Sequence, residues 1–278
     1  MNVNTLPKSK GDKFKIINRT KIELKQTRAN FNSKSSNVIV YSIFYADSYI
    51  RFAFVSIYFL IKNTDAEKFD IKIITDKKLS KKVKSIFEPI IGDNVIVSQK
   101  IFKHEAFNLL REKKNICFLD ADSFFLSKKR VDVFQRIFND DAVLMKPTKF
   151  RVKNEFKHRS KYWGWTAEQV DLFKKEWRTS DQIWHLAGFS NYPTKNFDQG
   201  FYSFLKWASE QNMYDDEALL LCYFFIKGIT IHSIQNHIQW LGGMEALKHN
   251  GEPAFIHPFE GESYYSKEIE NYFKKLVK

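Results

Sequence analysis

Two aspartates, Asp120 and Asp122, follow an apolar run at the end of the segment NICFLDAD (115–122). Side chains alternate along an extended chain, so residues at i and i+2 point to the same side. Two carboxylates separated by one small residue suit a hard divalent cation, Mn²⁺ or Mg²⁺, which keeps positions open for substrate phosphates. Asp-x-Asp pairs are common in solvated turns, but a pair that ends a hydrophobic strand indicates a metal site.

A scaffold for these acids is predicted by the periodicity of residues 38–125. Runs of β-branched and aromatic residues alternate with stretches of helical spacing. Strands are expected at 38–45, 69–76, 94–99 and 115–125, and helices at 49–63, 79–91 and 101–113. This alternation implies an α/β fold with a mostly parallel sheet and helices on both faces, and such sheets bind ligands beyond the carboxyl ends of their strands. Asp47 follows the first strand, so it should share that edge with Asp120 and Asp122.

The pattern becomes irregular in residues 147–196, where four of the six tryptophans lie: Trp163, Trp165, Trp177 and Trp184. We expect short helices there that cover an acceptor site. Exposed tryptophans suit the C–H faces of sugars, whereas burial in the core is the alternative for each ring. Helices are expected again at 197–209 and 213–227, a strand at 228–234, and a loop followed by an amphipathic helix at 251–278.

The chain is basic, with 278 residues and a net charge of +13. Residues 1–36 hold nine Lys/Arg and two Asp/Glu, which predicts a flexible basic segment, with contact to an anionic membrane surface as a further role. No secretory signal is visible, and the apolar stretch 52–61 is too short to span a bilayer. Cys117 and Cys222 sit in apolar runs without metal-site spacing, which favours a reducing compartment. We therefore expect a cytoplasmic protein, of a composition that suits a bacterial or virus-encoded enzyme.

The FLDAD run and the Phe124-Phe125 pair after it resemble the DxD motif of GT-A glycosyltransferases. Asp47-Ser48-Tyr49-Ile50, with Val55-Ser56 and Asn63 behind it, resembles the start of family 8 retaining transferases. The resemblance covers 37–145 well and 197–261 loosely. It implies a GT-A (Rossmann-like) fold over a single domain, 37–278. Residues 37–145 would then bind the nucleotide-sugar, and 146–278 would bind the acceptor and supply catalysis.

The resemblance also implies roles for individual residues at the donor. Asp47 would hydrogen-bond the uracil of a UDP-sugar and Tyr49 would stack on it, and Tyr45 belongs to the same donor-binding group. Asp120 would contact both the ribose and the metal, and Asp122 would coordinate the metal directly. Lys103 resembles the basic residue that faces the donor diphosphate. Its alternative role is that of a solvated helix charge.

Two later segments resemble further parts of the family pattern. His257 precedes Gly261 in a departure from the family's His-x-x-Gly-x-x-Lys, with one extra residue and no lysine at the expected place. By resemblance its imidazole would complete the metal site, as suits Mn²⁺, although a structural histidine is the alternative. Asp198, Gln199 and Gly200 resemble the family's F-N-x-G turn, which contacts the donor sugar.

The acidic triplet Asp215, Asp216 and Glu217 resembles the family's D-Q-D-x-L-N helix start. Asp216 stands where the retaining family has glutamine. A carboxylate there could act as general base on the acceptor hydroxyl, which would favour inversion. Alternatively, acidic residues at a helix N-terminus interact favourably with the helix dipole. This interaction explains one of the three acids better than it explains all three.

The function expected is metal-dependent transfer of a hexose or pentose from a UDP-sugar to a glycan or glycoprotein acceptor. A nucleotidyltransferase uses the same paired carboxylates, but it has a glycine-rich loop near the first strand, and residues 44–47 contain no glycine. A basic nucleic-acid-binding protein would fit the charge, yet no recognised binding motif is present, so no nucleic-acid partner is expected.

Overall fold

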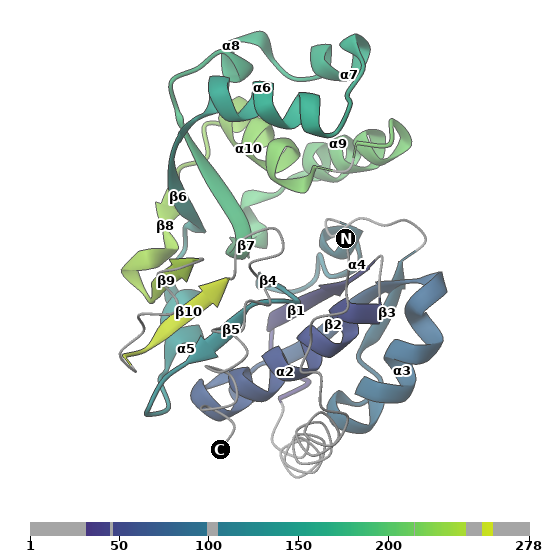
Figure 1. Cartoon of the computed structure of the whole chain (residues 1–278), viewed down its shortest axis with the longest axis vertical. Helices are drawn as coiled ribbons and strands as arrows, with labels where there is room; N and C mark the ends of the chain where they lie inside the picture. The colour runs from purple at the N-terminus through teal and green to yellow at the C-terminus, as the bar shows by residue number, and fades with distance from the viewer. Residues whose placement is uncertain (1–31, 45–46, 99–104, 214, 243–251, 258–278) are drawn as a thin grey trace, which may run out of the picture.

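The structure is a computed structural model that describes residues 32–44, 47–98, 105–213, 215–242 and 252–257 (Figure 1). Tyr45 and Lys103 lie outside the described residues, as do the basic segment up to residue 31 and the helix expected after 258. The division into a leader and one domain therefore stays a prediction.

A seven-stranded sheet forms the centre of the protein, in the order β3-β2-β1-β4-β7-β6-β8. Its strands are β1 (Asn37–Ile43), β2 (Asp70–Asp76), β3 (Val95–Ser98), β4 (Asn115–Asp120), β6 (Val143–Arg151), β7 (Ile183–Pro193) and β8 (Ile231–Ser233). All neighbours pair in parallel except β7, which runs antiparallel to both β4 and β6. The expected mostly parallel sheet is confirmed, with one reversed strand that the periodicity did not reveal.

Helices cover both faces of the sheet, as expected. One face carries α2 (Asp47–Asn63), α3 (Lys77–Ile91) and α5 (Val133–Asn139), and the other carries α4 (Glu105–Leu109), α9 (Gln199–Glu210) and α10 (Asp216–Lys227). The side chains of β1 explain this arrangement, because Val38 and Val40 join one core cluster while Ile39, Tyr41 and Ile43 join the other. Burial on both faces is the reason that the strand reads as a continuous apolar run.

Short elements follow β6, in the segment whose pattern was irregular. They are α6 (Val152–Tyr162), α7 (Ala167–Asp171) and α8 (Lys175–Arg178), with 3-10 turns at η2 (Ala66–Lys68), η3 (Thr194–Asn196) and η4 (Ile234–Asn236) elsewhere in the chain. Figure 1 shows α6 to α10 gathered at the top, away from α2 and α3. Trp177 and Trp184 are fully buried, so the core interpretation holds for both, whereas Trp163 is 46% exposed.

A second, three-stranded sheet was not anticipated. Its order is β5-β10-β9, formed by β5 (Phe124–Leu126), β10 (Ala254–His257) and β9 (Gln239–Gly242). β10 runs antiparallel to β5 and parallel to β9. Because β5 directly follows the acidic turn at 120–122, this sheet brings a distant part of the chain back to that turn.

The helix expected at 101–113 is shorter in the structure. Of the helix expected at 101–113, the described part is helical only over α4, because Lys114 already donates its backbone N–H to Ser36 at 2.7 Å and leads the chain into β4. Cys117 and Cys222 are buried free thiols, as expected from their apolar runs.

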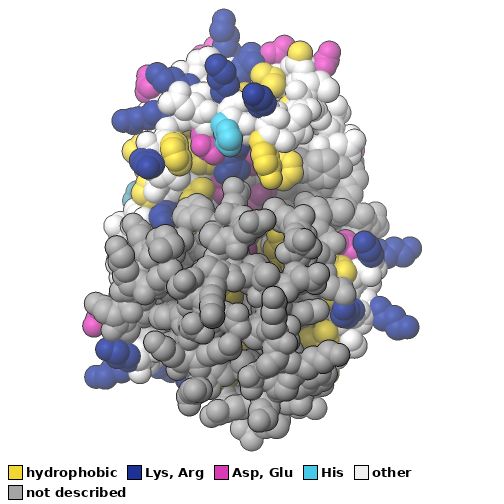
Figure 2. All heavy atoms as spheres, in the orientation of Figure 1, with side chains coloured by type: hydrophobic (Ala, Val, Ile, Leu, Met, Phe, Trp, Pro, Cys, Tyr) yellow, Lys and Arg dark blue, Asp and Glu magenta, His cyan; other side chains and the backbone are white. Residues whose placement is uncertain are grey.

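No helix among the described residues has the length and apolar character needed to cross a membrane. Of the described side chains on the face in Figure 2, Lys and Arg lie over its upper part and at both flanks.

Candidate active site at the carboxyl edge of the sheet

The carboxyl ends of β1 and β4 meet at one edge of the central sheet. In the parallel pairing of these strands, Ser42 stands opposite Asp120. Five residues after Ser42, Asp47 opens α2. The expectation that Asp47 and the Asp120–Asp122 turn share an edge is therefore confirmed for the backbone, while the Asp47 side chain lies outside the described part. We call this the carboxyl edge.

The acidic turn after β4 is anchored by α2. Asp122 is 9% exposed, and the backbone N–H of Ser123 donates to the carbonyl of Asp120 at 3.2 Å. The hydroxyl of Ser56 donates to the carbonyl of Ser123, and Asn63 Nδ2 donates to the carbonyl of Phe125 at 2.7 Å. The residues of the Val55-Ser56 and Asn63 pattern thus hold the backbone that follows the two aspartates.

His257 returns to this turn through β10. Ile256 pairs with Phe124 in the antiparallel register, so the next position, His257, lies beside Ser123. Its side chain is not described. Among the side chains that are described, no three or more His, Cys, Asp or Glu gather as a metal site. The backbone therefore brings the three predicted metal ligands to one place, and their coordination stays a prediction.

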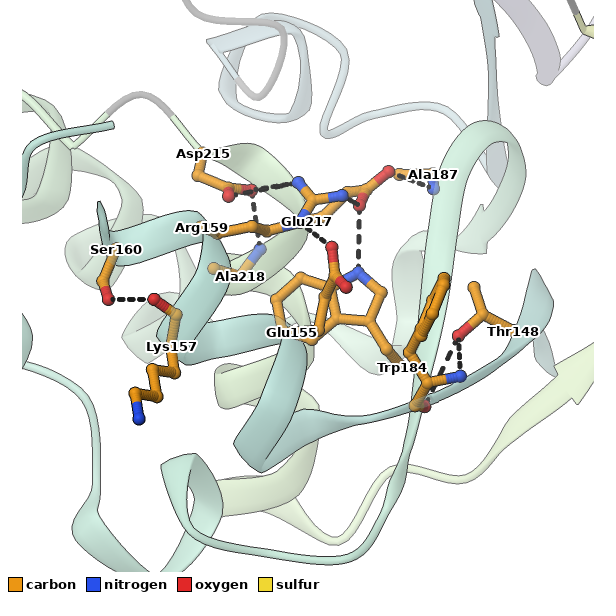
Figure 3. Close-up of polar contacts among 11 residues, drawn as sticks. Thr148, Glu155, Lys157, Arg159, Ser160, Trp184, Ala187, Asp215, Glu217 and Ala218 are labelled. Carbon is orange, nitrogen blue, oxygen red and sulfur yellow. Dashed lines mark hydrogen bonds and ion pairs between the residues drawn. The ribbon is translucent and has the colours of Figure 1, made fainter. Parts of the chain in front are cut away.

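The acidic start of α10 is held by an arginine from α6 (Figure 3). Asp215 caps the helix by accepting the backbone N–H of Ala218 at 3.1 Å. Arg159 contacts three carboxylates, with Nη1 at 3.1 Å from Asp215, Nη2 at 2.6 Å from Glu217 and Nε at 3.0 Å from Glu155. The guanidinium also lies over the ring of Trp184, at 4.9 Å from its centroid.

Glu217 fastens this start of α10 to the central sheet. It accepts the backbone N–H of Ala187 at 2.9 Å and the indole N–H of Trp184 at 3.1 Å. Ala187 comes two residues before Phe189 in the sequence, and Phe189 pairs with Leu119 of β4. Since β7 is antiparallel to β4, Ala187 lies on the side toward which β4 runs. The acidic triplet is thus at the carboxyl edge, together with Asp120 and Asp122.

Burial and charge oppose each other in this cluster. Burial raises the pKa of Asp215 and of Glu217, and the charge of Arg159 acts in the opposite direction on both. Burial disfavours the charge on Arg159 too, but attraction from Glu217 and Asp215 outweighs it and leaves the pKa of Arg159 above its ordinary value. Each ion is therefore stabilised by the others, and removing any one would leave buried charge unpaired.

Asp198, Gln199 and Gly200 are not at the carboxyl edge. Thr194, at the start of the turn before them, donates its backbone N–H to Lys114, which immediately precedes β4. Asp198 caps α9 through the N–H of Phe201 at 3.0 Å and pairs with Lys227, the last residue of α10, at 2.8 Å. The eleven residue steps of α10 from Asp216 to Lys227 correspond to about 16 Å. The predicted contact of these three residues with the donor sugar stays a prediction.

The close approach at Gly200 has a local cause. A Cβ at this position would lie 2.9 Å from Oδ1 of Asp198, so the glycine leaves room for the cap of α9. The F-N-x-G-like pattern is therefore explained here by helix capping. Tyr49, in contrast, lies at the carboxyl edge in the first turn of α2, with its ring 6.1 Å from that of Phe52.

Arg159 and Glu155 were not predicted as site residues, and Trp184 was predicted only as a core or sugar-stacking ring. Their segment matched no known motif, and Arg159 is one of 45 Lys/Arg. One signal was present, because Glu155 and Arg159 stand four residues apart, where helical side chains pair. Nothing in that spacing reveals the second and third carboxylates, which lie more than fifty residues further along the chain.

No protein-family model matches the sequence, and no curated protein matches it either. The fold, however, is similar to that of an active-site mutant of LgtC, with a TM-score of 0.51 and 13% identity over 86% of this chain and 95% of that one. The chain adopts the fold of LgtC. Lower similarity is found to galactosyltransferase LgtC with donor and acceptor sugar analogs (TM-score 0.46, 13% identity, 86% and 95% covered). The mannosyltransferase Ktr4p of S. cerevisiae with GDP gives a TM-score of 0.45 at 12% identity, with 81% and 78% covered.

Within this fold, the carboxyl edge gathers most of the residues that the sequence singled out. Asp120 ends β4 and Asp122 follows it, Asp47 and Tyr49 open α2, His257 ends β10, and the acidic triplet begins α10. Four segments from distant parts of the chain therefore meet at the end of one sheet. This is the place where α/β sheets bind their ligands.

Proposed function

We propose that this chain is a metal-dependent glycosyltransferase that moves a hexose or pentose from a UDP-sugar to a hydroxyl of a glycan or another acceptor. One observation carries the proposal: the acidic turn after β4, the end of β10 and the acidic start of α10 converge at the carboxyl edge of a glycosyltransferase-fold sheet. Paired carboxylates and a third, separate acidic group in one place suit a reaction that needs both a cation and a base.

The ligand set that we propose for the metal is Asp120, Asp122 and His257. Two carboxylates and an imidazole suit Mn²⁺, with Mg²⁺ as the alternative. When bound, the cation would neutralise the charge that develops on the diphosphate as it leaves the sugar. We propose that Asp47 and Tyr49 bind the uracil, with Tyr45 in the same group, and that Lys103 contacts the diphosphate.

Asp216 is the base that we propose for the acceptor. The carboxylate of Asp215 accepts hydrogen bonds from the first turn of α10 and from Arg159. The carboxylate of Glu217 accepts them from Ala187, Trp184 and Arg159. Asp216 stands between them as the first residue of α10, partly exposed. Its carboxylate would take the acceptor proton as the acceptor oxygen bonds to the anomeric carbon and the bond to the diphosphate breaks, which gives inversion.

Thermal unfolding tests the class and the donor together. The protein is heated with UDP-glucose, UDP-galactose, UDP-xylose, UDP-N-acetylglucosamine and GDP-mannose, each with and without Mn²⁺. We expect one UDP-sugar to raise the melting temperature only when Mn²⁺ is present, because ligands that bind the folded state stabilise it. Asp122→Asn should abolish the metal-dependent part of the thermal shift. Asp141→Asn is the control and should keep it, because Asp141 is an exposed residue paired with Lys195. No metal-dependent shift with any nucleotide sugar would refute the proposal.

A further inference from the structure

We infer that Arg159 is a positioning residue that fixes the proposed base, Asp216, at the carboxyl edge of the sheet. The inference rests on the proposed function for the identity of the base. Its geometric basis is independent of that function, because it comes from contacts between α6, α10 and β7. Arg159 touches neither the predicted metal ligands nor the donor-binding residues in any contact described above.

The guanidinium binds the residues on both sides of Asp216 in the sequence. Nη1 contacts Asp215 at 3.1 Å and Nη2 contacts Glu217 at 2.6 Å (Figure 3). The remaining nitrogen, Nε, contacts Glu155 of its own helix at 3.0 Å. Because Glu155 lies one turn before Arg159, this third contact limits the rotamers of the arginine. The two residues that flank Asp216 are therefore held by a side chain that is itself held in place.

The first turn of α10 is fixed from three directions. Asp215 caps it, Arg159 binds it from α6, and Glu217 ties it to Ala187 of β7. Arg159 is the residue that joins the first two contacts to the third, since it binds both Asp215 and Glu217. Rotation of α10 about its axis or a slide along it would break at least one of these bonds, and either motion would displace Asp216.

Charge makes the arginine difficult to replace. Asp215 is buried and Glu217 largely so, and the cation of Arg159 is what offsets the burial of both carboxylates. A lysine would keep the positive charge but would lose the planar fork that reaches two carboxylates at once. Arg159→Lys should therefore retain the fold while loosening the start of α10, which makes it the informative variant.

The first test is kinetic, with UDP release from UDP-glucose and UDP-galactose in Mn²⁺ as the readout. We expect Arg159→Lys to lower kcat by about a hundredfold, as displacement of a reacting group by about 1 Å does. The KM for the donor and the Mn²⁺-dependent thermal shift should stay unchanged, because the donor site does not include Arg159. Arg178→Lys is the matched control and should keep the wild-type kcat. In the wild type, Arg178 pairs with the exposed Asp171 at 2.8 Å.

A merely structural arginine would behave differently in this test. It would lower the melting temperature and leave kcat unchanged at temperatures where the variant is folded, and that result would overturn the inference. If Arg159→Lys does not fold, Glu217→Gln takes its place, since it removes the charge that Nη2 contacts and keeps the side-chain shape. The same selective loss of kcat is expected.

The second test needs no substrate and separates this inference from the proposed function. Amide hydrogen exchange at Ala187 and Ala218, the two backbone donors to Glu217 and Asp215, should be faster in Arg159→Lys, with the later turns of α10 unchanged. Unchanged exchange at both amides would refute the positioning role even in an active enzyme. Faster exchange in a protein that binds no UDP-sugar would leave the positioning intact and refute the proposed function alone.

Discussion

The carboxylate of Glu217 accepts the backbone N–H of Ala187 at 2.9 Å, and this bond fixes where α10 begins relative to the central sheet. Ala187 lies on β7, past the pair formed by Phe189 and Leu119 in the direction in which β4 runs. A single side chain thus links a helix of the second half of the chain to β7, the neighbour of the strand that ends in Asp120.

Asp216→Asn should lower turnover with a UDP-sugar by about 10²–10⁴-fold, the usual contribution of a general base. The donor-dependent thermal shift should persist, because the amide keeps the shape of the side chain. Asp215→Asn is the comparison, since Asp215 caps α10 and binds Arg159, and it should lower the melting temperature. Initial rates of UDP release and thermal melts measure both. Equal turnover in Asp216→Asn and wild type would eliminate Asp216 as the base.

Trp184→Phe should destabilise the protein by about 1.5–3 kcal/mol, the contribution of a hydrogen bond to a charged group. The indole N–H donates to Glu217 at 3.1 Å, and phenylalanine has no donor to replace it. Trp163→Phe, at a position 46% exposed, is the control and should change stability by less than about 0.5 kcal/mol. Urea unfolding followed by circular dichroism gives both values. Equal losses in the two variants would contradict the role of the indole.

Asp198→Asn should lower stability at neutral pH and lose this effect in acid. Donors on Lys227 and Tyr223 and the N–H of Phe201 lower the pKa of Asp198 from 3.8 to about 2. A carboxyl with a lowered pKa stabilises the fold above its unfolded-state value, and that stability is lost as the pH falls through the folded-state value. The difference in melting temperature between wild type and variant should therefore shrink as the pH falls from 3.8 toward 2. A constant difference over this range would show that the ion pair contributes nothing.

His257→Ala should remove most of the Mn²⁺-dependent thermal shift with UDP-sugars. The register places His257 beside Ser123, next to the acidic turn. His237→Ala is the control, because His237 Nε2 lies 3.1 Å from Asp140 in a separate hydrogen bond. Titration of Mn²⁺ by electron paramagnetic resonance reports the metal directly. Unchanged Mn²⁺ affinity in His257→Ala would leave the metal to Asp120 and Asp122 alone.

The sequence was informative where a single local rule decides the outcome. The alternation of Val38 to Ile43 between two apolar faces and the helical spacing of 49–63 predict β1 and α2 directly, and the parallel order of such units follows. The shared edge of Asp47 and Asp120 is a consequence of that order. Each of these predictions uses residues that are near one another in the chain.

The rest depended on contacts between distant residues. Arg159 meets Asp215 and Glu217 only because α6 packs beside α10, and no periodicity encodes that pairing. Asp198 and Gly200 carried a pattern that reads equally well as a sugar-binding turn or as a helix cap, and the hydrogen bond from Phe201 that shows the cap cannot be read from the pattern. The reversed strand β7 lies in the segment 147–196, whose irregular pattern predicted short helices and no strand.

The reversed strand also sets the order in which the protein can assemble. β4 ends at Asp120, but its neighbour on one side is β7, whose last residue is Pro193. Until that part of the chain leaves the ribosome, β4 has an open edge of unpaired backbone groups, which favours pairing with other chains. Temperature or crowding during synthesis should therefore affect the yield of this protein more than its final stability would indicate.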